Sequence, residues 1–237
     1  QLVIPPLETD KSYGRQPDGS NAWYIFDLPT PGSSNNATMA TLLEPTFSDQ
    51  AGFYTDSFTL FLTSPNTGDT ILYTIDGSEP DINNTGGRFY TTKQDYASTD
   101  TINKSYRTFI YTSSGILIKN RQSDTNKISL IRPSPNWWTA PTTNINKNMV
   151  VRAVSYQTGA QKSKIETNSF FIDPAAENRY SLPVVSISTN EDNLFDYYSG
   201  IHVPGKFYYD YAPQGGYWPK ITANYNRKGR AWERPAM

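Results

Sequence analysis

The sequence predicts an all-β protein, a β-sandwich with little helix. Aromatic residues make up 14% of the 237-residue chain, with 17 tyrosines among them, and aromatic side chains favour strands. Glycine (15 residues) and proline (17 residues) recur along the chain as turn formers. Short runs that alternate in period two stand between these turn signals, as half-buried strands do.

The first half of the chain holds four of the expected elements. After the turn signal QPDGS, the run AWYIF at 22–26 predicts a short strand. The run LPTPGSSNN at 28–36 predicts a proline-stiffened linker. The runs SFTLFLT at 57–63 and ILYTI at 71–75 alternate and predict two further strands.

The second half holds longer strands and one helical turn. Two strands within 148–173 flank Thr158-Gly159, which predicts a hairpin. The apolar run LPVVSIST at 182–189 predicts a buried strand. The following stretch NEDNLFD predicts a helical turn capped by Asn190, with acidic residues near its N-terminus.

Composition excludes several classes of function. The formal net charge of -1 gives no field for nucleic acid or an anionic membrane, and no apolar run is long enough to insert into a membrane. The chain has no Cys and one His, His202, so thiolate chemistry and histidine-rich metal sites are excluded. We therefore expect no cofactor, no metal and no catalytic residue.

The stretch ILYTIDGSEPD ends in three carboxylates, which raises the question of a cation site. Asp76, Glu79 and Asp81 carry the oxygen ligands that Ca²⁺ prefers, but they lack the alternating spacing and closing Glu of an EF-hand loop. Asp-Gly between alternating strands is a turn signal by itself. We therefore predict that Asp76 and Gly77 form a structural turn that closes a β-hairpin.

The stretch GIHVPGKF at 200–207 approaches the spacing of a phosphate-binding loop. Phe207 stands where a Mg²⁺-binding hydroxyl is needed, and Pro204 has no N–H for a phosphate. We interpret it as a strand that ends at Pro-Gly. The lysines at 206, 220 and 228 are expected to be solvated surface charges rather than nucleotide contacts.

Two aromatic loops carry the alternative hypothesis of carbohydrate binding. SPNWWTAP holds Trp137 and Trp138, and GGYWPK holds Tyr217 and Trp218. Flat rings in such loops can stack on sugars, but Tyr and Trp also fill cores and protein interfaces.

The first 35 residues resemble the end of a lamin-tail-like domain. The resemblance rests on SYGRQPDG at 12–19, the aromatic strand and TPG at 30–32. It implies that residues 1–35 are the C-terminal end of such a domain plus a Pro-rich linker.

Residues 44–173 resemble the immunoglobulin-like C-terminal domain of chitobiase and β-hexosaminidases. The resemblance rests on YTIDGSEP at 73–80, VRAVS at 151–155 and the spaced residues Gly159, Ser163, Thr167, Phe171 and Ile172. It implies an immunoglobulin- or fibronectin III-like sandwich. An insertion at about 91–147 departs from the family, and its runs at 107–120 and 127–133 predict an inserted hairpin.

Residues 180–237 resemble the start of the spore coat protein H (CotH) kinase-like domain. LPVVS at 182–186, DNLFD at 192–196, GIHVPG at 200–205 and RAWERPA at 230–236 carry this resemblance. It implies a truncated domain whose metal-binding residues lie beyond residue 237.

These observations favour a non-catalytic spacer module of a secreted or cell-surface multidomain bacterial protein. Its expected partners are the neighbouring domains of the same polypeptide. The alternatives are a carbohydrate-binding module, with glycans or other surface proteins as partners, and a part of a CotH-type protein kinase with its active site beyond residue 237.

Overall fold

The computed structural model shows an all-β, sandwich-like fold with little helix. It describes residues 4–7, 9, 11–26, 29–35, 41–93, 102–132, 139–211 and 222–237. The strands are β1 Ser12–Arg15, β2 Trp23–Phe26, β3 Thr46–Phe47, β4 Gly52–Tyr54, β5 Phe58–Leu60, β6 Leu62–Thr63, β7 Thr70–Thr74, β8 Arg88–Thr92, β9 Ile102–Tyr106, β10 Phe109–Ile110, β11 Ile116–Ile118, β12 Met149–Tyr156 and β13 Glu166–Ile172. The α-helices of the described residues are α1 Glu191–Phe195 and α2 Gly205–Tyr211.

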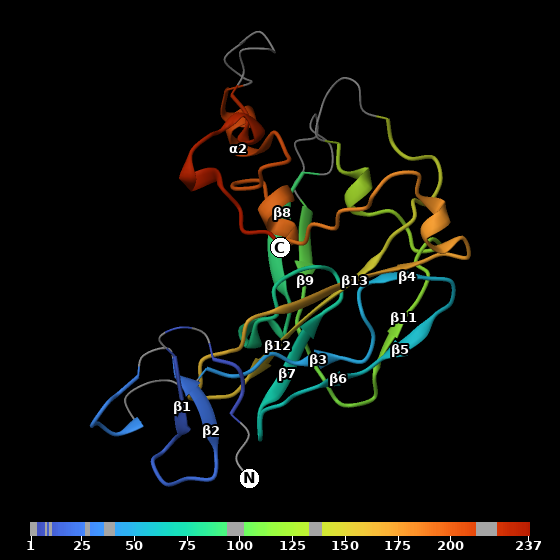
Figure 1. The fold of residues 1–237 in the computed structure, drawn as a ribbon. Helices are drawn as coiled ribbons and strands as arrows, with labels where there is room; N and C mark the ends of the chain where they lie inside the picture. The colour runs from blue at the N-terminus through green and yellow to red at the C-terminus, as the bar shows by residue number, and fades with distance from the viewer. Residues whose placement is uncertain are drawn as a thin grey trace.

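One layer of the sandwich is a five-stranded sheet in the order β10-β7-β12-β13-β4 (Figure 1). All its neighbours run antiparallel except β13 and β4, which are parallel. The predicted hairpin around Thr158-Gly159 is confirmed as β12 and β13, with Val151 opposite Asn168. Central strand β12 pairs on its other side with β7, where Ala153 lies opposite Tyr73.

The second layer is made of the pairs β11-β5 and β3-β6. The predicted alternation at 57–63 is confirmed, because Leu60 and Leu62 point into the core whereas Phe61 is exposed. The core between the layers is continuous and apolar, as sheet-on-sheet packing requires. Its buried members are Leu60, Leu62, Ile71, Ile116, Ile118, Met149, Val151, Ala153, Phe170 and Ile172.

The insertion contributes strands to both layers as well as a hairpin of its own. The inserted hairpin is β8 with β9, in which Tyr90 lies opposite Lys104. The prediction of a hairpin from the runs at 107–120 and 127–133 is wrong, because β10 pairs with β7 and β11 pairs with β5. Period-two alternation identifies a strand but not its partner. The second run forms a 3-10 turn, Ile128–Leu130.

The segment at 182–189 differs most from its prediction. It forms no strand, and Leu182, Val185 and Ile187 are 77%, 81% and 73% exposed. The prediction of a buried strand is therefore wrong. The stretch at 200–207 is not a strand end either, because turns there lead into α2 at Gly205.

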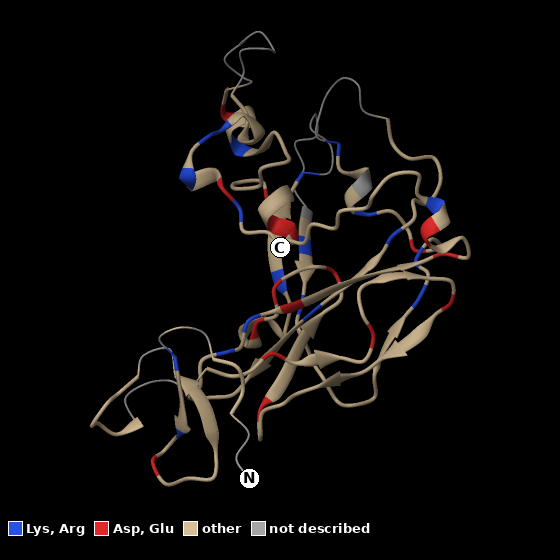
Figure 2. Ribbon diagram, viewed as in Figure 1, with Lys and Arg blue, Asp and Glu red and all other residues tan. Residues whose placement is uncertain are grey.

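The N-terminal hairpin and the region after residue 190 lie on opposite sides of the sandwich. Figure 1 shows the β1-β2 hairpin at one end and the helices α1 and α2 at the other, with β8 and β9 rising toward α1. Figure 2 shows basic and acidic positions interspersed over the described parts of the ribbon.

Candidate functional site

The corner at residues 76–79 joins strand β12 to the segment that begins α1 through a set of polar contacts. Asp76 Oδ1 accepts hydrogen bonds from the Ser78 backbone N–H (3.0 Å) and from Ser78 Oγ (2.6 Å). Gly77 has a φ of 86°, which suits glycine because it carries no Cβ. Thr74 Oγ1 donates to the Ser78 carbonyl at 2.6 Å. The Asp-Gly-Ser sequence therefore builds a tight turn from its own side chains.

The turn does not close a β-hairpin, in contrast to the prediction. Strand β7, which precedes it, pairs with β12 and β10, whereas the chain after it continues through the 3-10 turn Ile82–Asn84 into β8. The corner is instead folded back over β12.

Arg152 of β12 contacts the corner through its guanidinium. Its side chain is only 3% exposed, and Nη1 donates to the Gly77 carbonyl at 3.1 Å. Glu79 Oε1 lies 3.8 Å from Nη2. Burial lowers the pKa of the Arg152 guanidinium, and the Glu79 carboxylate opposes this effect. The corner therefore supplies the polar partners that a buried cation needs.

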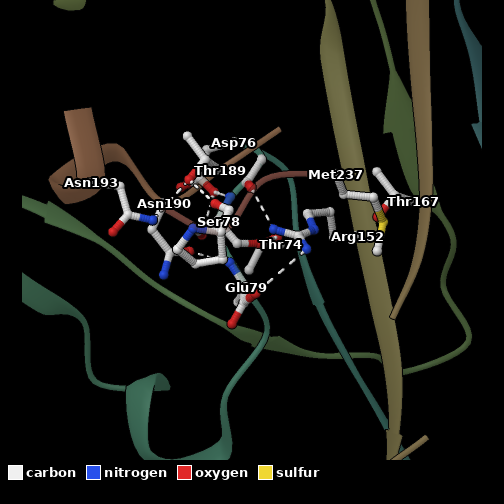
Figure 3. Close-up of polar contacts among 12 residues, drawn as sticks. Thr74, Asp76, Ser78, Glu79, Arg152, Thr167, Thr189, Asn190, Asn193 and Met237 are labelled. Carbon is white, nitrogen blue, oxygen red and sulfur yellow. Dashed lines mark hydrogen bonds and ion pairs between the residues drawn. The ribbon is translucent and has the colours of Figure 1, made fainter. Parts of the chain in front are cut away.

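The corner also binds a segment more than 100 residues away in sequence (Figure 3). The Glu79 backbone N–H donates to Asn190 Oδ1 at 2.6 Å. The predicted cap at Asn190 is therefore only half right: α1 begins after it, but its side chain makes no cap hydrogen bond. A Cβ on Gly77 would lie 3.8 Å from Ser188 Cβ, so the turn and Ser188 are in contact.

The last residues of the chain complete this contact. Ser188 and Met237 exchange both backbone hydrogen bonds, at 2.7 and 2.9 Å. Thr189 Oγ1 donates to the Pro235 carbonyl at 2.6 Å, and Asn193 Nδ2 donates to Thr189 Oγ1 at 2.8 Å. We call the corner at 76–79 together with Arg152, residues 188–190 and Met237 the clasp.

The β8-β9 hairpin contacts the residues that follow the clasp, Glu191 to Tyr197. Tyr90 O–H donates to the Glu191 carboxylate, and Arg88 Nη2 lies 3.5 Å from Asp192 Oδ2. The Tyr197 backbone N–H donates to the carbonyl of Thr91 at 2.6 Å. A small apolar cluster contains side chains of the β8-β9 hairpin and of the region around α1. Its buried members are Tyr90, Tyr106, Ile131, Phe195 and Val203.

Burial changes the proton affinity of the groups at this contact. Desolvation raises the pKa of Glu191, and the hydrogen bond from Tyr90 opposes that effect. Desolvation followed by the Glu191 interaction raises the pKa of Tyr90 well above its ordinary range. Tyr90 therefore stays a hydrogen-bond donor at neutral pH.

The N-terminal hairpin is joined to the sandwich by a separate contact. The Thr41 backbone N–H donates to the Ile25 carbonyl of β2 at 2.6 Å. The Leu42 backbone N–H donates to the Gln161 carbonyl of the β12-β13 loop at 2.9 Å. Residues 41–42 thus bridge the two parts by backbone pairing, and Leu42 and Phe26 are buried there.

The predicted carbohydrate-binding residues fall outside the described residues. These are Trp137, Trp138, Tyr217 and Trp218. In the part of the chain that the structure describes, no three His, Cys, Asp or Glu side chains gather closely enough to hold a metal ion. Lys206, which follows the first residue of α2, pairs with Asp210 at 2.5 Å. No helix in the described ranges is long and apolar enough to cross a membrane.

Sequence reasoning missed the clasp. It identified the turn at Asp76-Gly77 and the helix start at Asn190, but no local pattern links two segments this far apart. The one available signal was Arg152, a charged residue in the middle of an apolar strand, which needs a partner when buried.

Comparison with known proteins identifies no relative. The chain matches no family model, and neither a curated protein nor a solved structure is significantly similar to it.

Proposed function

We propose that this chain is a non-catalytic spacer module of a secreted or cell-surface multidomain bacterial protein. In this proposal the β-sandwich sets the orientation of a lamin-tail-like hairpin at 1–35 relative to a CotH kinase-like segment at 180–237. Its immunoglobulin-like sandwich is of the chitobiase C-terminal type. Its partners are the neighbouring domains of the same polypeptide.

The observation that carries the proposal is that the segment after residue 187 is held on two sides. Within the clasp, the corner at 76–79 holds Asn190. The β8-β9 hairpin holds α1 through Tyr90 and Arg88. Two separated contacts prevent the rotation that one contact allows. A spacer needs this rigidity, because a single short linker would leave the neighbours free to turn.

A distance measurement tests the proposed rigidity. The chain has no Cys, so pairs of introduced cysteines carry spin labels cleanly. Labels at Thr67→Cys in the sandwich and Lys228→Cys near the end should give one narrow distance distribution. The matched control is Thr67→Cys with Lys119→Cys, both within the sandwich. A distribution much broader than that of the control pair would contradict the proposal.

The proposal places no reaction in these residues. In a longer polypeptide with a CotH-type kinase activity, phosphoryl transfer would require groups beyond this chain, because that chemistry needs a complete two-lobed site. Titration of the chain with Mg²⁺-ATP tests this point. Saturable binding of the nucleotide would overturn it.

A further inference from the structure

The tripeptide Asp-Gly-Ser occurs twice in the chain, at 18–20 and at 76–78. Both copies form turns in which the glycine has a positive φ, 81° at Gly19 and 86° at Gly77. The Asp-Gly bond is chemically distinctive, because glycine has no Cβ to hinder attack of its backbone nitrogen on the preceding side-chain carboxyl. The two copies therefore share their local chemistry and differ in what surrounds them.

The first copy lies at the turn of the β1-β2 hairpin and is weakly held. Asp18 and Gly19 are exposed, and a Cβ on Gly19 would meet no atom within 4 Å. Oδ2 of Asp18 accepts a hydrogen bond from the Asn35 backbone N–H at 3.3 Å. Among the described residues, the Gly19 N–H donates to no backbone carbonyl. The Ser20 hydroxyl donates to the Ala22 carbonyl and not to Asp18.

The second copy, at the corner, is held by several contacts. Asp76 is exposed, but Gly77 and Ser78 are buried. Both the N–H and the hydroxyl of Ser78 donate to Asp76 Oδ1. The Asp76 backbone pairs with Val150 as an isolated parallel bridge, and Arg152 donates to the Gly77 carbonyl. A reaction between the Gly77 nitrogen and the Asp76 carboxyl would have to break such contacts.

We propose that Asp18-Gly19 is a site of spontaneous isoaspartate formation, whereas the structure protects Asp76-Gly77. In the first step the Gly19 nitrogen bonds to Asp18 Cγ and gives up its proton, and one carboxyl oxygen leaves as water. The product is a cyclic imide. Water then adds to the main-chain carbonyl of Asp18, and the bond from that carbon to the Gly19 nitrogen breaks. The nitrogen takes back a proton and keeps its bond to Cγ, so the product is an isomer of the same mass.

The modification would act on the contact between the hairpin and the linker. Asn35 joins the two, because its Nδ2 donates to the Arg15 carbonyl at 2.8 Å and its Oδ1 accepts from Thr30 Oγ1 at 3.0 Å. Its backbone N–H donates to Asp18. Isoaspartate inserts a methylene into the main chain and displaces this carboxylate, so the Asn35 N–H should exchange faster in the isomerised chain. The inference goes beyond the proposed spacer function and does not rest on it.

The test compares the two copies within one molecule. The full chain is kept folded in warm neutral buffer, and samples taken over time are digested and analysed by mass spectrometry with fragmentation that distinguishes isoaspartate from aspartate. Isoaspartate should accumulate at Asp18. It should form about tenfold more slowly at Asp76, because two hydrogen bonds to the carboxylate must first break. In urea the two rates should become similar, since both sites have the same tripeptide sequence.

Two serine variants supply a matched pair. Ser78→Ala removes one hydrogen bond to the Asp76 carboxylate and should raise the rate of isoaspartate formation at Asp76. Ser20→Ala removes no bond to Asp18 and should leave the rate at Asp18 unchanged. Equal rates at the two sites in the folded chain would overturn the proposal. Conversion of Asp18 in urea but not in the folded chain would overturn it as well, because the fold would then protect both sites.

Discussion

The sandwich and the region after residue 180 differ in how they obtain their order. The sandwich buries a continuous apolar core between two paired layers, with Leu60, Val151 and Phe170 fully inaccessible. The later region has two short helices and a small apolar cluster, and two members of this cluster, Tyr90 and Tyr106, belong to the β8-β9 hairpin. The sandwich is stabilised from within, whereas the later region depends on contacts with the sandwich.

This difference assigns a role to the insertion. The side chains of a hairpin that contacted no other part of the chain would be exposed to solvent. Tyr90 of β8 and Tyr106 of β9 are instead buried in the cluster around Phe195. The β8-β9 hairpin, which includes the start of the insertion, is therefore one of the two contacts by which the sandwich holds this region. Variants can therefore distinguish the interactions that stabilise the sandwich from those that attach the region after residue 180 to it.

The largest effect is expected in the sandwich core. Phe170→Ala removes a fully buried ring that packs against Phe58 and Tyr54, and should lower the free energy of unfolding by about 3–5 kcal/mol. Urea denaturation followed by circular dichroism measures the change. Phe89→Ala is the matched control, because Phe89 is 68% exposed and should cost about 0.5 kcal/mol or less. Equal losses in the two variants would refute the core as described.

A smaller effect is expected where the sandwich meets the clasp. Arg152→Met keeps an apolar stem in the sheet but leaves the Gly77 carbonyl without its donor. We expect a loss of roughly 1–3 kcal/mol, with faster amide exchange at 76–79. Arg230→Met, at an exposed position, should leave both unchanged. No loss in Arg152→Met would mean that burying the guanidinium costs as much as its bonds stabilise.

The same comparison shows which features the sequence predicts. Alternation predicted the strands at 57–63 and 71–75, and Thr158-Gly159 predicted the hairpin, because these signals are local. The sequence does not show what covers a strand. The apolar run at 182–189 therefore predicted a buried strand, although Leu182, Val185 and Ile187 are exposed. The runs at 107–120 and 127–133 predicted a hairpin, although the two strands within 107–120 join different layers.

The candidate site illustrates the same limit. Asp76 and Gly77 predict a turn because the side chain of Asp76 bonds within three residues. Asn190 predicts a helix start by the same local logic. The hydrogen bond that joins the two segments, from the Glu79 N–H to Asn190, spans 111 residues and has no local signature.

The contact between the hairpin and α1 should respond to pH. The pKa of Glu191 is higher in the folded protein than in the unfolded chain, so the folded state holds its proton more tightly. Its contribution to stability is complete below the ordinary glutamate pKa and is lost as pH rises through the raised pKa. A tenfold difference in proton affinity between the folded and unfolded states would change the free energy of unfolding by at most about 1.4 kcal/mol.

A pH series on the protein and on Glu191→Gln measures this contribution. Between about pH 4 and about pH 8, the free energy of unfolding should fall more with pH in the natural chain than in the variant. The Gln side chain still accepts the Tyr90 hydrogen bond but does not titrate. Parallel pH profiles for the two proteins would show that Glu191 is not buried as described.

The most direct test of the clasp is the exchange rate of a single backbone proton, the Glu79 N–H. This proton is donated to the side chain of Asn190, whereas the neighbouring Ser78 N–H is donated to Asp76 within the turn. In Asn190→Ala the Glu79 N–H should exchange much faster, and the Ser78 N–H should keep its rate. Fast exchange at Glu79 in the natural chain, or an unchanged rate in the variant, would show that the sandwich does not hold its neighbour at this corner.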